Sequence, residues 1–470
     1  MGADPRTEMS RMPWGGRFER GPHPDLMALT ASIGTDMRLL PQDLASTRAH
    51  ARVLAAADLL ARKELARVDQ LCKDLMTEWE AGTLIADPGD EDVHSLVERL
   101  LTERLGETGR RIHAGRSRND LVASDLRLWC RDAASDTIDD LRALISLIAD
   151  FGDAQADTLM PGYTHLQPAQ PVTAGFHLLA HGFALLRDAR RFKAAYAAAD
   201  VSALGAGAIA GSTLGLDPEI AAHELDLSST FDNAMDAVSD RDFAADLVYA
   251  CALCGVHLSR LAEEIVLWTS SEFGFARLSD DWSTGSSMMP QKRNPDMAEL
   301  IRGRASGGVA ALTGLLVLLK GLPLAYDRDL QEDKGYVFQA VDRLRGCIRG
   351  TIGLLGAIRF DKQRMAEAAA GSGAWATDLA ETLVRRGVPF RDAHNATGKL
   401  VAALESQGRG LTDLDGEELR GFHDRFEPSD LAAADPRVGL AARKGKGGTA
   451  PDRVAEQAAR LRSAGDALAS

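Results

Sequence analysis

Residues 285–296 (GSSMMPQKRNPD) gather side chains that could stabilise a developing negative charge. The glycine and the central proline oppose helix, so a loop is predicted, with the ammonium of Lys292 six residues after the hydroxyl of Ser286. Asn294 and Pro295 are typical of an N-cap and a first helical residue. The alternative is an ordinary exposed loop before a helix. Hydroxyls, a cation, an amide and a helix N-terminus together favour a site for an anionic transition state.

The segment HAGRSRND at 113–120 also precedes a predicted long helix. The guanidinium groups of Arg116 and Arg118 could hold carboxylates bidentately, and Asn119 could cap the helix or bind a ligand. The alternative is a pair of solvated arginines beside a helix cap. The segment therefore indicates a binding function only in combination with others.

A histidine stands beside a hydroxyl in PGYTHLQPAQP at 161–171, which is predicted to be a proline-punctuated loop. His165, next to Thr164, could act as an acid or base near neutral pH. Because a lone histidine is more often structural, this pair also counts only in combination.

Two more segments carry weaker signals. Ser32, in TASIGTD at 30–36, is a candidate ligand. The segment AYDRDLQEDKG at 325–335 opens a predicted helix, and its default interpretation is charged surface. Its candidate residues are Tyr326, Gln331, Asp333 and Lys334.

Two patterns that resemble metal or redox motifs are set aside. Cys251 and Cys254 form a CxxC pair, but Cys254 lies on an apolar helical seam, so core packing is predicted. His177 and His181 are one helical turn apart, yet their helix lacks the glutamate of a zinc-protease motif. No metal site is predicted from either pattern.

Long helices must position these loops. Within 240–271, apolar residues from Phe243 to Trp268 recur every three or four positions, which is typical of a heptad-like seam. Strand signals are nearly absent. Helices are also predicted within 43–80, and five much longer ones are predicted over 119–157, 172–199, 240–271, 295–321 and 330–358. Their lengths predict an all-α fold built on a long bundle rather than a compact globule.

The 470-residue length predicts more than one core. Composition changes place boundaries near 115 and 361, giving an N-terminal helical domain (1–115), a central long-helix bundle (116–361) and a C-terminal helical domain (362–470). Small residues interspersed on long apolar helices suggest association with further copies, so a homo-oligomer is expected.

A net charge of −14 disfavours nucleic acid and anionic membrane surfaces as partners. No apolar run is long enough to cross a bilayer, and the first residues contain no apolar segment typical of a signal peptide. Five scattered cysteines suit a reducing compartment. The expectation is a cytoplasmic protein.

Taken together, the segments resemble a known family. GSSMMPQKRNPD resembles the signature of the fumarase/aspartase superfamily of lyases, and HAGRSRND, PGYTHLQPAQP, DAVSDRDF (236–243) and AYDRDLQEDK narrow the resemblance to the argininosuccinate lyase family. GAWATDLAETLVRRGVPFRDAH (373–394), WGGRF (14–18) and GGTAP (447–451) extend it over nearly the whole chain.

The resemblance implies a three-domain all-α homotetramer. Its core would hold twenty helices from four five-helix bundles, and each active site would take residues from three subunits. It also implies cleavage of argininosuccinate to arginine and fumarate, the last step of arginine biosynthesis, by anti elimination through an aci-carboxylate carbanion. Neither a metal nor an organic cofactor is implied.

The resemblance assigns roles position by position. Ser286 matches the catalytic serine of a flexible loop, which is usually assigned as the base. His165 matches the catalytic histidine, an acid in some schemes and a base in others, and Glu299 matches its carboxylate partner. Lys292 and Asn294 match residues that hold the substrate carboxylate. Further substrate contacts correspond to Ser32, Arg118, Asn119, Thr164, Tyr326, Gln331 and Lys334.

The chain departs from the family pattern at Leu214-Gly215 and Pro218, where a Phe-Pro pair and an arginine are frequent, and in smaller ways at Ala114 and Arg293. Other superfamily lyases (adenylosuccinate lyase, fumarase, aspartase) share the 285–296 signature and remain an alternative. A non-catalytic, crystallin-like structural protein is another.

Overall fold

The computed structural model describes residues 23–371 and 373–469 of the chain. The structure is 69% helix and 6% strand, which confirms the all-α fold class. The WGGRF segment at 14–18 lies outside the described residues. Within the described ranges, no helix is both long enough and apolar enough to cross a membrane.

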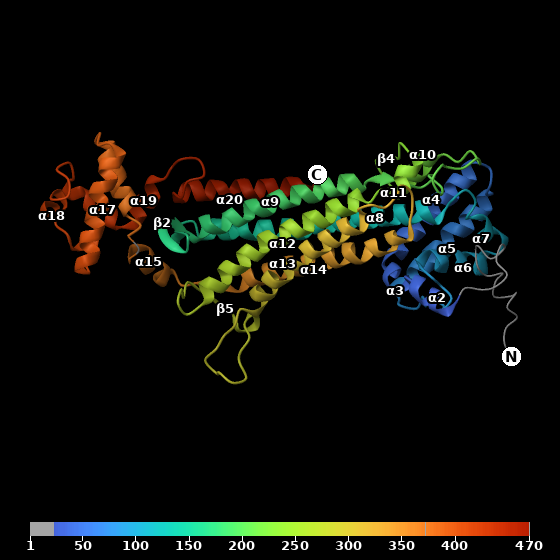
Figure 1. Cartoon of the computed structure of the whole chain (residues 1–470), viewed down its shortest axis with the longest axis horizontal. Helices are drawn as coiled ribbons and strands as arrows, with labels where there is room; N and C mark the ends of the chain where they lie inside the picture. The colour runs from blue at the N-terminus through green and yellow to red at the C-terminus, as the bar shows by residue number, and fades with distance from the viewer. Residues whose placement is uncertain (1–22, 372, 470) are drawn as a thin grey trace. The chain divides into compact units, whose positions relative to one another are not determined.

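Five helices of 24 to 37 residues confirm the predicted long helices (Figure 1). On α12, every residue of the predicted seam from Phe243 to Trp268 is at most 3% exposed. The regular recurrence of apolar positions therefore located a buried helical face correctly. The long helices are α8 (Arg118–Ala154), α9 (Ala174–Ala199), α12 (Asp242–Thr269), α13 (Asp296–Leu319) and α14 (Asp333–Ala357).

The chain divides into two compact units. Among the described residues, unit 1 consists of 23–134, 194–248 and 311–338, and unit 2 of 135–193, 249–310, 339–371 and 373–469. Each unit is assembled from separate stretches because the long helices run from one set of residues into the other. The predicted domain boundaries near 115 and 361 remain predictions.

Unit 1 contains the short N-terminal helices. Its core includes Ala49 and Val53 of α4, Leu121 and Leu128 of α8, and Leu225. The helices predicted within 43–80 are confirmed as α4 and α5. The shorter elements of unit 1 are α2 (Pro24–Thr30), α3 (Ile33–Asp36), α4 (Leu40–Ala56), α5 (Arg62–Glu80), α6 (Val93–Leu105), α7 (Glu107–Arg111), α10 (Pro218–Glu224) and α11 (Ala234–Ser239), with the parallel strands β3 (Val201–Ser202) and β4 (Ser229–Thr230).

In unit 2, close helix packing depends on glycine. A Cβ on Gly182 of α9 would lie 2.4 Å from Leu461 and 2.9 Å from Ile148 of α8. Only a residue without a side chain therefore lets α9 approach both neighbours, and Leu461 belongs to the C-terminal helix α20. Gly182 thus serves packing within one chain, and the expected association between copies remains a prediction. The C-terminal helices are α15 (Lys362–Gly371), α16 (Ala376–Arg385), α17 (Phe390–Gln407), α18 (Gly416–Arg420), α19 (Pro436–Ala442) and α20 (Pro451–Asp466).

The segment 161–171, predicted to be a loop, is instead a β-hairpin. Strand β1 (Leu159–Thr164) pairs antiparallel with β2 (Gln167–Thr173), with an irregularity between Gly162 and Tyr163. The strands were not predicted because both contain proline, which lacks the backbone N–H that pairs neighbouring strands. A second short antiparallel pair joins β5 (Ala276–Leu278) to β6 (Ile358–Phe360).

Candidate active site

The predicted site residues fall into two groups, one in each unit. In unit 1, Ser32 and Gln331 lie close together although 299 positions separate them in the sequence. The backbone N–H of Ser32 donates to the Glu91 carbonyl at 2.8 Å. Gln331 donates from Nε2 to the carbonyl of Thr30 at 3.2 Å. The tertiary structure therefore brings together the segments of Ser32 and Gln331, two candidates that the sequence supported only weakly.

Lys334 is the buried cation of this group. Its side chain is 4% exposed, and its Nζ lies 3.2 Å from Asp333 Oδ1 and 3.9 Å from Asp36 Oδ1. Burial alone would lower the pKa of Lys334, but the carboxylates of Asp333 and Asp36 outweigh it, so this pKa is raised. Asp36 also accepts a hydrogen bond from Ser32 Oγ. Lys334 therefore keeps its charge at neutral pH, as a residue that holds an anion must.

Asp333 and Arg241 hold Lys334 in place, and their pairing was not predicted from the sequence. Arg241 Nε donates to Asp333 Oδ2 at 2.6 Å, and both side chains are fully buried. Both lie in segments that resemble the family pattern, but 92 residues separate them, so the sequence gave no sign that they meet. Nearby Tyr326 has a pKa raised by burial, so its phenol stays protonated.

At the start of α8, Arg118 is already paired. Its Nη1 lies 3.1 Å from Glu91 Oε2 and 3.2 Å from Asp92 Oδ2. A ligand carboxylate would have to share Arg118 with these groups. Glu91 also pairs with Arg328, which was not among the predicted site residues. Arg116 is only 8% exposed and donates from Nη1 to Thr47 at 3.1 Å. It therefore has a structural role in the core and, contrary to the prediction, is not open to a ligand carboxylate.

Asn119 does not cap α8, which corrects one of its two predicted roles. The helix begins at Arg118, and the preceding Ser117 occupies the cap: its N–H donates to Asp120 Oδ1 at 2.9 Å, and its Oγ accepts from Asn119 N at 3.3 Å. Serine with an acidic residue three positions later is a capping box, a pattern readable from the sequence. The Asn119 amide instead donates to the Ala208 carbonyl at 3.2 Å.

In unit 2, His165 stands at the tip of the hairpin. His165 and Leu166 both have φ of 56° and form the two-residue connection between β1 and β2, with Thr164 exposed beside them. Such turns favour Asn-Gly because positive φ strains other residues, at about 1–3 kcal/mol each. A histidine at this turn therefore costs folding stability. Such a cost is expected at a position where a functional side chain is needed.

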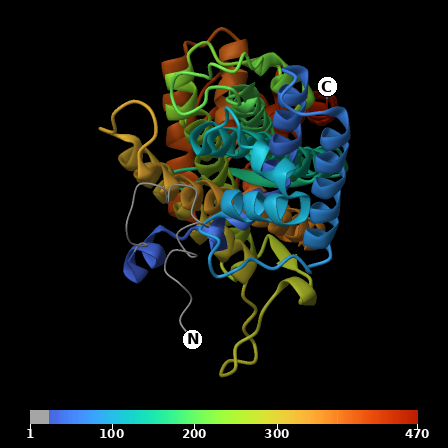
Figure 2. The same ribbon diagram turned by 90° about the vertical axis from the view of Figure 1, so that its right-hand side faces the viewer.

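The 285–293 segment is a loop, as predicted. Its base is fixed by a bridge between Thr284 and Asn294, whose backbone hydrogen bonds measure 2.8 and 3.1 Å. From this base the loop projects away from the helices of unit 2 (Figures 1 and 2). Lys292 and Met288 are exposed on it. Helix α13 begins at Asp296, one residue later than predicted.

Two backbone amides within this loop converge on the serine hydroxyl. The N–H groups of Met288 and Met289 donate to Ser286 Oγ at 3.2 and 3.1 Å. Donors aimed at one oxygen stabilise negative charge on it more than they stabilise the neutral hydroxyl. These donors would stabilise an alkoxide at Ser286 if one formed; that Ser286 acts as a base remains a prediction.

Glu299 lies in the first turn of α13 and lines an open hollow of about 580 Å³. The other residues of that hollow are Leu300, Gly303, Arg304, Asp342 and Arg343. Within residues 23–371 and 373–469, no hydrogen bond or ion pair joins the side chains of His165, Ser286, Lys292 and Glu299. That Glu299 orients His165 remains a prediction.

Comparisons with known proteins show the family of the chain. A family model described as lyase matches residues 16–308, and one described as argininosuccinate lyase C-terminal matches residues 374–438. The argininosuccinate lyase of Acidothermus cellulolyticus is 49% identical, over 96% of this chain and 93% of that protein. That of Frankia casuarinae is also 49% identical, over 96% and 97%.

Solved structures agree on the fold. A crystal structure of EDDS lyase in complex with formate superposes with a TM-score of 0.83 at 26% identity, covering 94% of this chain and 89% of that one. Class II fumarase from Schistosoma mansoni superposes with a TM-score of 0.76 at 16% identity, covering 90% and 95%, which shows the shared fold alone. With relatives this similar over nearly its whole length, the chain belongs to the argininosuccinate lyase family and is an enzyme of the lyase class.

Proposed function

We propose that the protein cleaves argininosuccinate to L-arginine and fumarate, the last step of arginine biosynthesis. The observation that carries this proposal is the 49% identity to argininosuccinate lyases over 96% of the chain. It favours this substrate over those of fumarase, aspartase and adenylosuccinate lyase. It also favours catalysis over a crystallin-like structural role, because Ser286, His165 and Lys292 are all present.

The reaction removes a weakly acidic proton beside a carboxylate and then breaks the C–N bond to the guanidino nitrogen. The intermediate concentrates two negative charges on one carboxylate group. The enzyme must therefore bind this aci-carboxylate more tightly than it binds the substrate. Lys292, Asn294 and the N-terminus of α13 are the proposed stabilising groups, acting once the loop has closed over substrate.

Ser286 is the proposed base. A serine hydroxyl is a poor base unless its alkoxide is stabilised, and the amides of Met288 and Met289 supply such stabilisation. The proton passes to Ser286 Oγ, and the electron pair of the breaking C–N bond stays with the departing nitrogen. His165, oriented by Glu299, then protonates that nitrogen as arginine leaves. The double bond of fumarate forms between the two carbons.

The unit 1 group is proposed to bind the rest of the substrate. Lys334 and Arg118 would contact carboxylates. Ser32, Asn119, Tyr326 and Gln331 would contribute hydroxyl and amide hydrogen bonds, and Thr164 would do so beside His165. A chain with a net charge of −14 thereby gains local positive charge where an anionic ligand needs it.

The active enzyme is proposed to be a homotetramer whose sites combine residues of several subunits. Exposed apolar side chains on two long helices support self-association, since a monomer would leave them in water. Tyr249 and Val256 of α12 are 48% and 39% exposed and, being seven residues apart, share one face. On α13, Leu316 and Val317 are 51% and 67% exposed. Light scattering coupled to gel filtration should find four 50.3 kDa chains per particle.

A cytoplasmic location is proposed from the cysteines. All five are buried and free of disulfides, which suits a reducing compartment. Burial raises the pKa values of Cys251 and Cys254 well above the ordinary range of a thiol, so neither thiol is a ready nucleophile or metal ligand.

Incubation with argininosuccinate tests the function directly. Arginine and fumarate should appear in equal amounts, with fumarate followed by its ultraviolet absorbance and arginine by amino-acid analysis. Adenylosuccinate, aspartate and malate serve as competing substrates under the same conditions. Fumarate release from one of these, with none from argininosuccinate, would assign the protein to another branch of the superfamily.

A further inference from the structure

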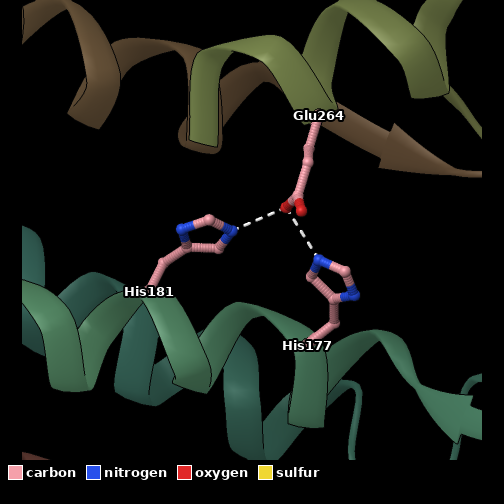
Figure 3. A group of neighbouring side chains, drawn as sticks. All are labelled: His177, His181 and Glu264. Atoms are coloured by element: carbon pink, nitrogen blue, oxygen red, sulfur yellow. Dashed lines mark hydrogen bonds and ion pairs between the residues drawn. The ribbon is translucent and has the colours of Figure 1, made fainter. Parts of the chain in front are cut away.

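Three side chains that could bind a metal ion converge between α9 and α12 in unit 2 (Figure 3). The Nε2 atoms of His177 and His181 lie 2.7 and 2.6 Å from the same oxygen of Glu264, Oε2. The three donor atoms all lie within 4.8 Å of one another. The histidine pair was not predicted to bind a metal because its own helix lacks a glutamate, but α12 supplies one from more than 80 positions away.

The two helices hold these donors in position before any ion binds. Residues four apart share one face of a helix, so His177 and His181 point toward the same neighbour. Trp268 packs edge-on against the His177 ring, with ring centroids 5.2 Å apart. A second pair, Asp188 of α9 and His257 of α12, is joined at 2.7 Å and fixes how the helices align.

The donor types match a divalent transition metal. Imidazole nitrogen and carboxylate oxygen bind Zn²⁺ at about 2.0–2.2 Å, which places neighbouring ligand atoms of a tetrahedral site roughly 3.3 Å apart. The observed 2.6 and 2.7 Å contacts would therefore open by about 0.6 Å, within reach of side-chain rotation alone. The Nε2 hydrogens that now donate to Glu264 would move to Nδ1 or leave to solvent.

Access from solvent distinguishes this site from another cluster with similar chemistry. The side chains of His177, His181 and Glu264 are 23%, 13% and 31% exposed. In the cluster of Asp43, His94 and Asp125, no side chain is more than 5% exposed. An ion in water can reach the first group, whereas the second is sealed inside unit 1.

We propose that His177, His181 and Glu264 form a binding site for one divalent transition-metal ion of the zinc class, bridging α9 and α12. Three protein ligands leave at least one coordination position for water. The site shares no residue with the proposed elimination machinery. Its expected effect is to cross-link two long helices, which raises the melting temperature when the ion is bound.

Cobalt titration of the full, tag-free chain tests the proposal. After EDTA treatment and removal of the chelator, Co²⁺ should give the intense visible bands of a four-coordinate ion, saturating at one ion per chain. Zn²⁺ should abolish these bands by displacement and raise the melting temperature. Absence of saturable binding, or only the pale spectrum of hydrated cobalt, would overturn the proposal.

Matched variants show whether the ion binds at these residues. Glu264→Gln keeps the side-chain shape but removes the charge, and His177→Asn removes one imidazole. Each should weaken cobalt binding by at least about tenfold. His394→Asn removes an exposed histidine elsewhere in unit 2 and should change nothing. Equal affinities in Glu264→Gln and the unchanged protein would refute the site, and circular dichroism shows that each variant is folded.

Discussion

His94 joins three helices of unit 1, and its protonation should contribute to stability. It lies on α6, and its Nδ1 is 2.6 Å from Asp43 of α4 and 3.5 Å from Asp125 of α8. Burial alone would lower the pKa of His94, but the hydrogen bond and charge of Asp43, with Asp92 and Asp125, raise it to about 9. Asp92 also contacts Arg118, so this cluster supports the proposed substrate-binding group.

The size of the effect follows from that pKa. The ordinary value is 6.5, and each unit of difference is worth about 1.36 kcal/mol, so proton binding adds about 3 kcal/mol to the free energy of unfolding. Because the folded pKa lies above the unfolded one, this contribution is fully present below about pH 6.5. It disappears as the pH rises through about 9.

Urea unfolding followed by circular dichroism, at one fixed protein concentration and several pH values from 6 to 10, measures this loss. In Asp43→Asn, which keeps the shape but removes the principal charge facing His94, most of the loss should vanish. Asp58→Asn changes an exposed aspartate of the same unit and should behave like the unchanged protein. The reasoning is refuted if Asp43→Asn loses stability with pH as steeply as the unchanged protein does.

Three further substitutions test the site and the packing. Ser286→Ala should lower kcat by about 10²–10⁴ with an unchanged melting temperature, since it removes the proposed base from an exposed loop; near-normal turnover would exclude that role. Asp333→Asn should reduce the free energy of unfolding by about 3–5 kcal/mol, because it leaves the charge of Arg241 buried without its partner. Gly182→Val should cost about 1–3 kcal/mol because its side chain would overlap Leu461.

Each of these substitutions has a matched control. Ser287→Ala removes the neighbouring exposed hydroxyl, and its turnover should stay within a few-fold of the unchanged protein. Asp329→Asn alters an exposed acid close to Asp333. Gly356→Val introduces the same side chain on α14 at a position with nothing within 4 Å of the new Cβ. If Asp333→Asn and Asp329→Asn lose the same free energy of unfolding, the buried-charge explanation is wrong. If Gly182→Val and Gly356→Val do so, the packing explanation is wrong.

Helix positions were predictable because their signal is local. The spacing of apolar residues located the buried face of α12 and placed Cys254 in the core. Glycine and proline in the 285–293 segment gave a loop before α13. Each of these features depends on residues within a few turns of one another, so the order of residues alone contains the information.

Partners that meet across the fold were not predictable in this way. The hairpin that strains His165 exists because two strands pair, and proline had hidden both of them. Glu264 joins His177 only because α12 packs on α9, and Arg241 meets Asp333 across 92 positions. By itself, the sequence determined which helices form and which loops carry reactive groups. Tertiary packing decided which groups face one another, because contacts between elements depend on how whole helices dock rather than on any local pattern.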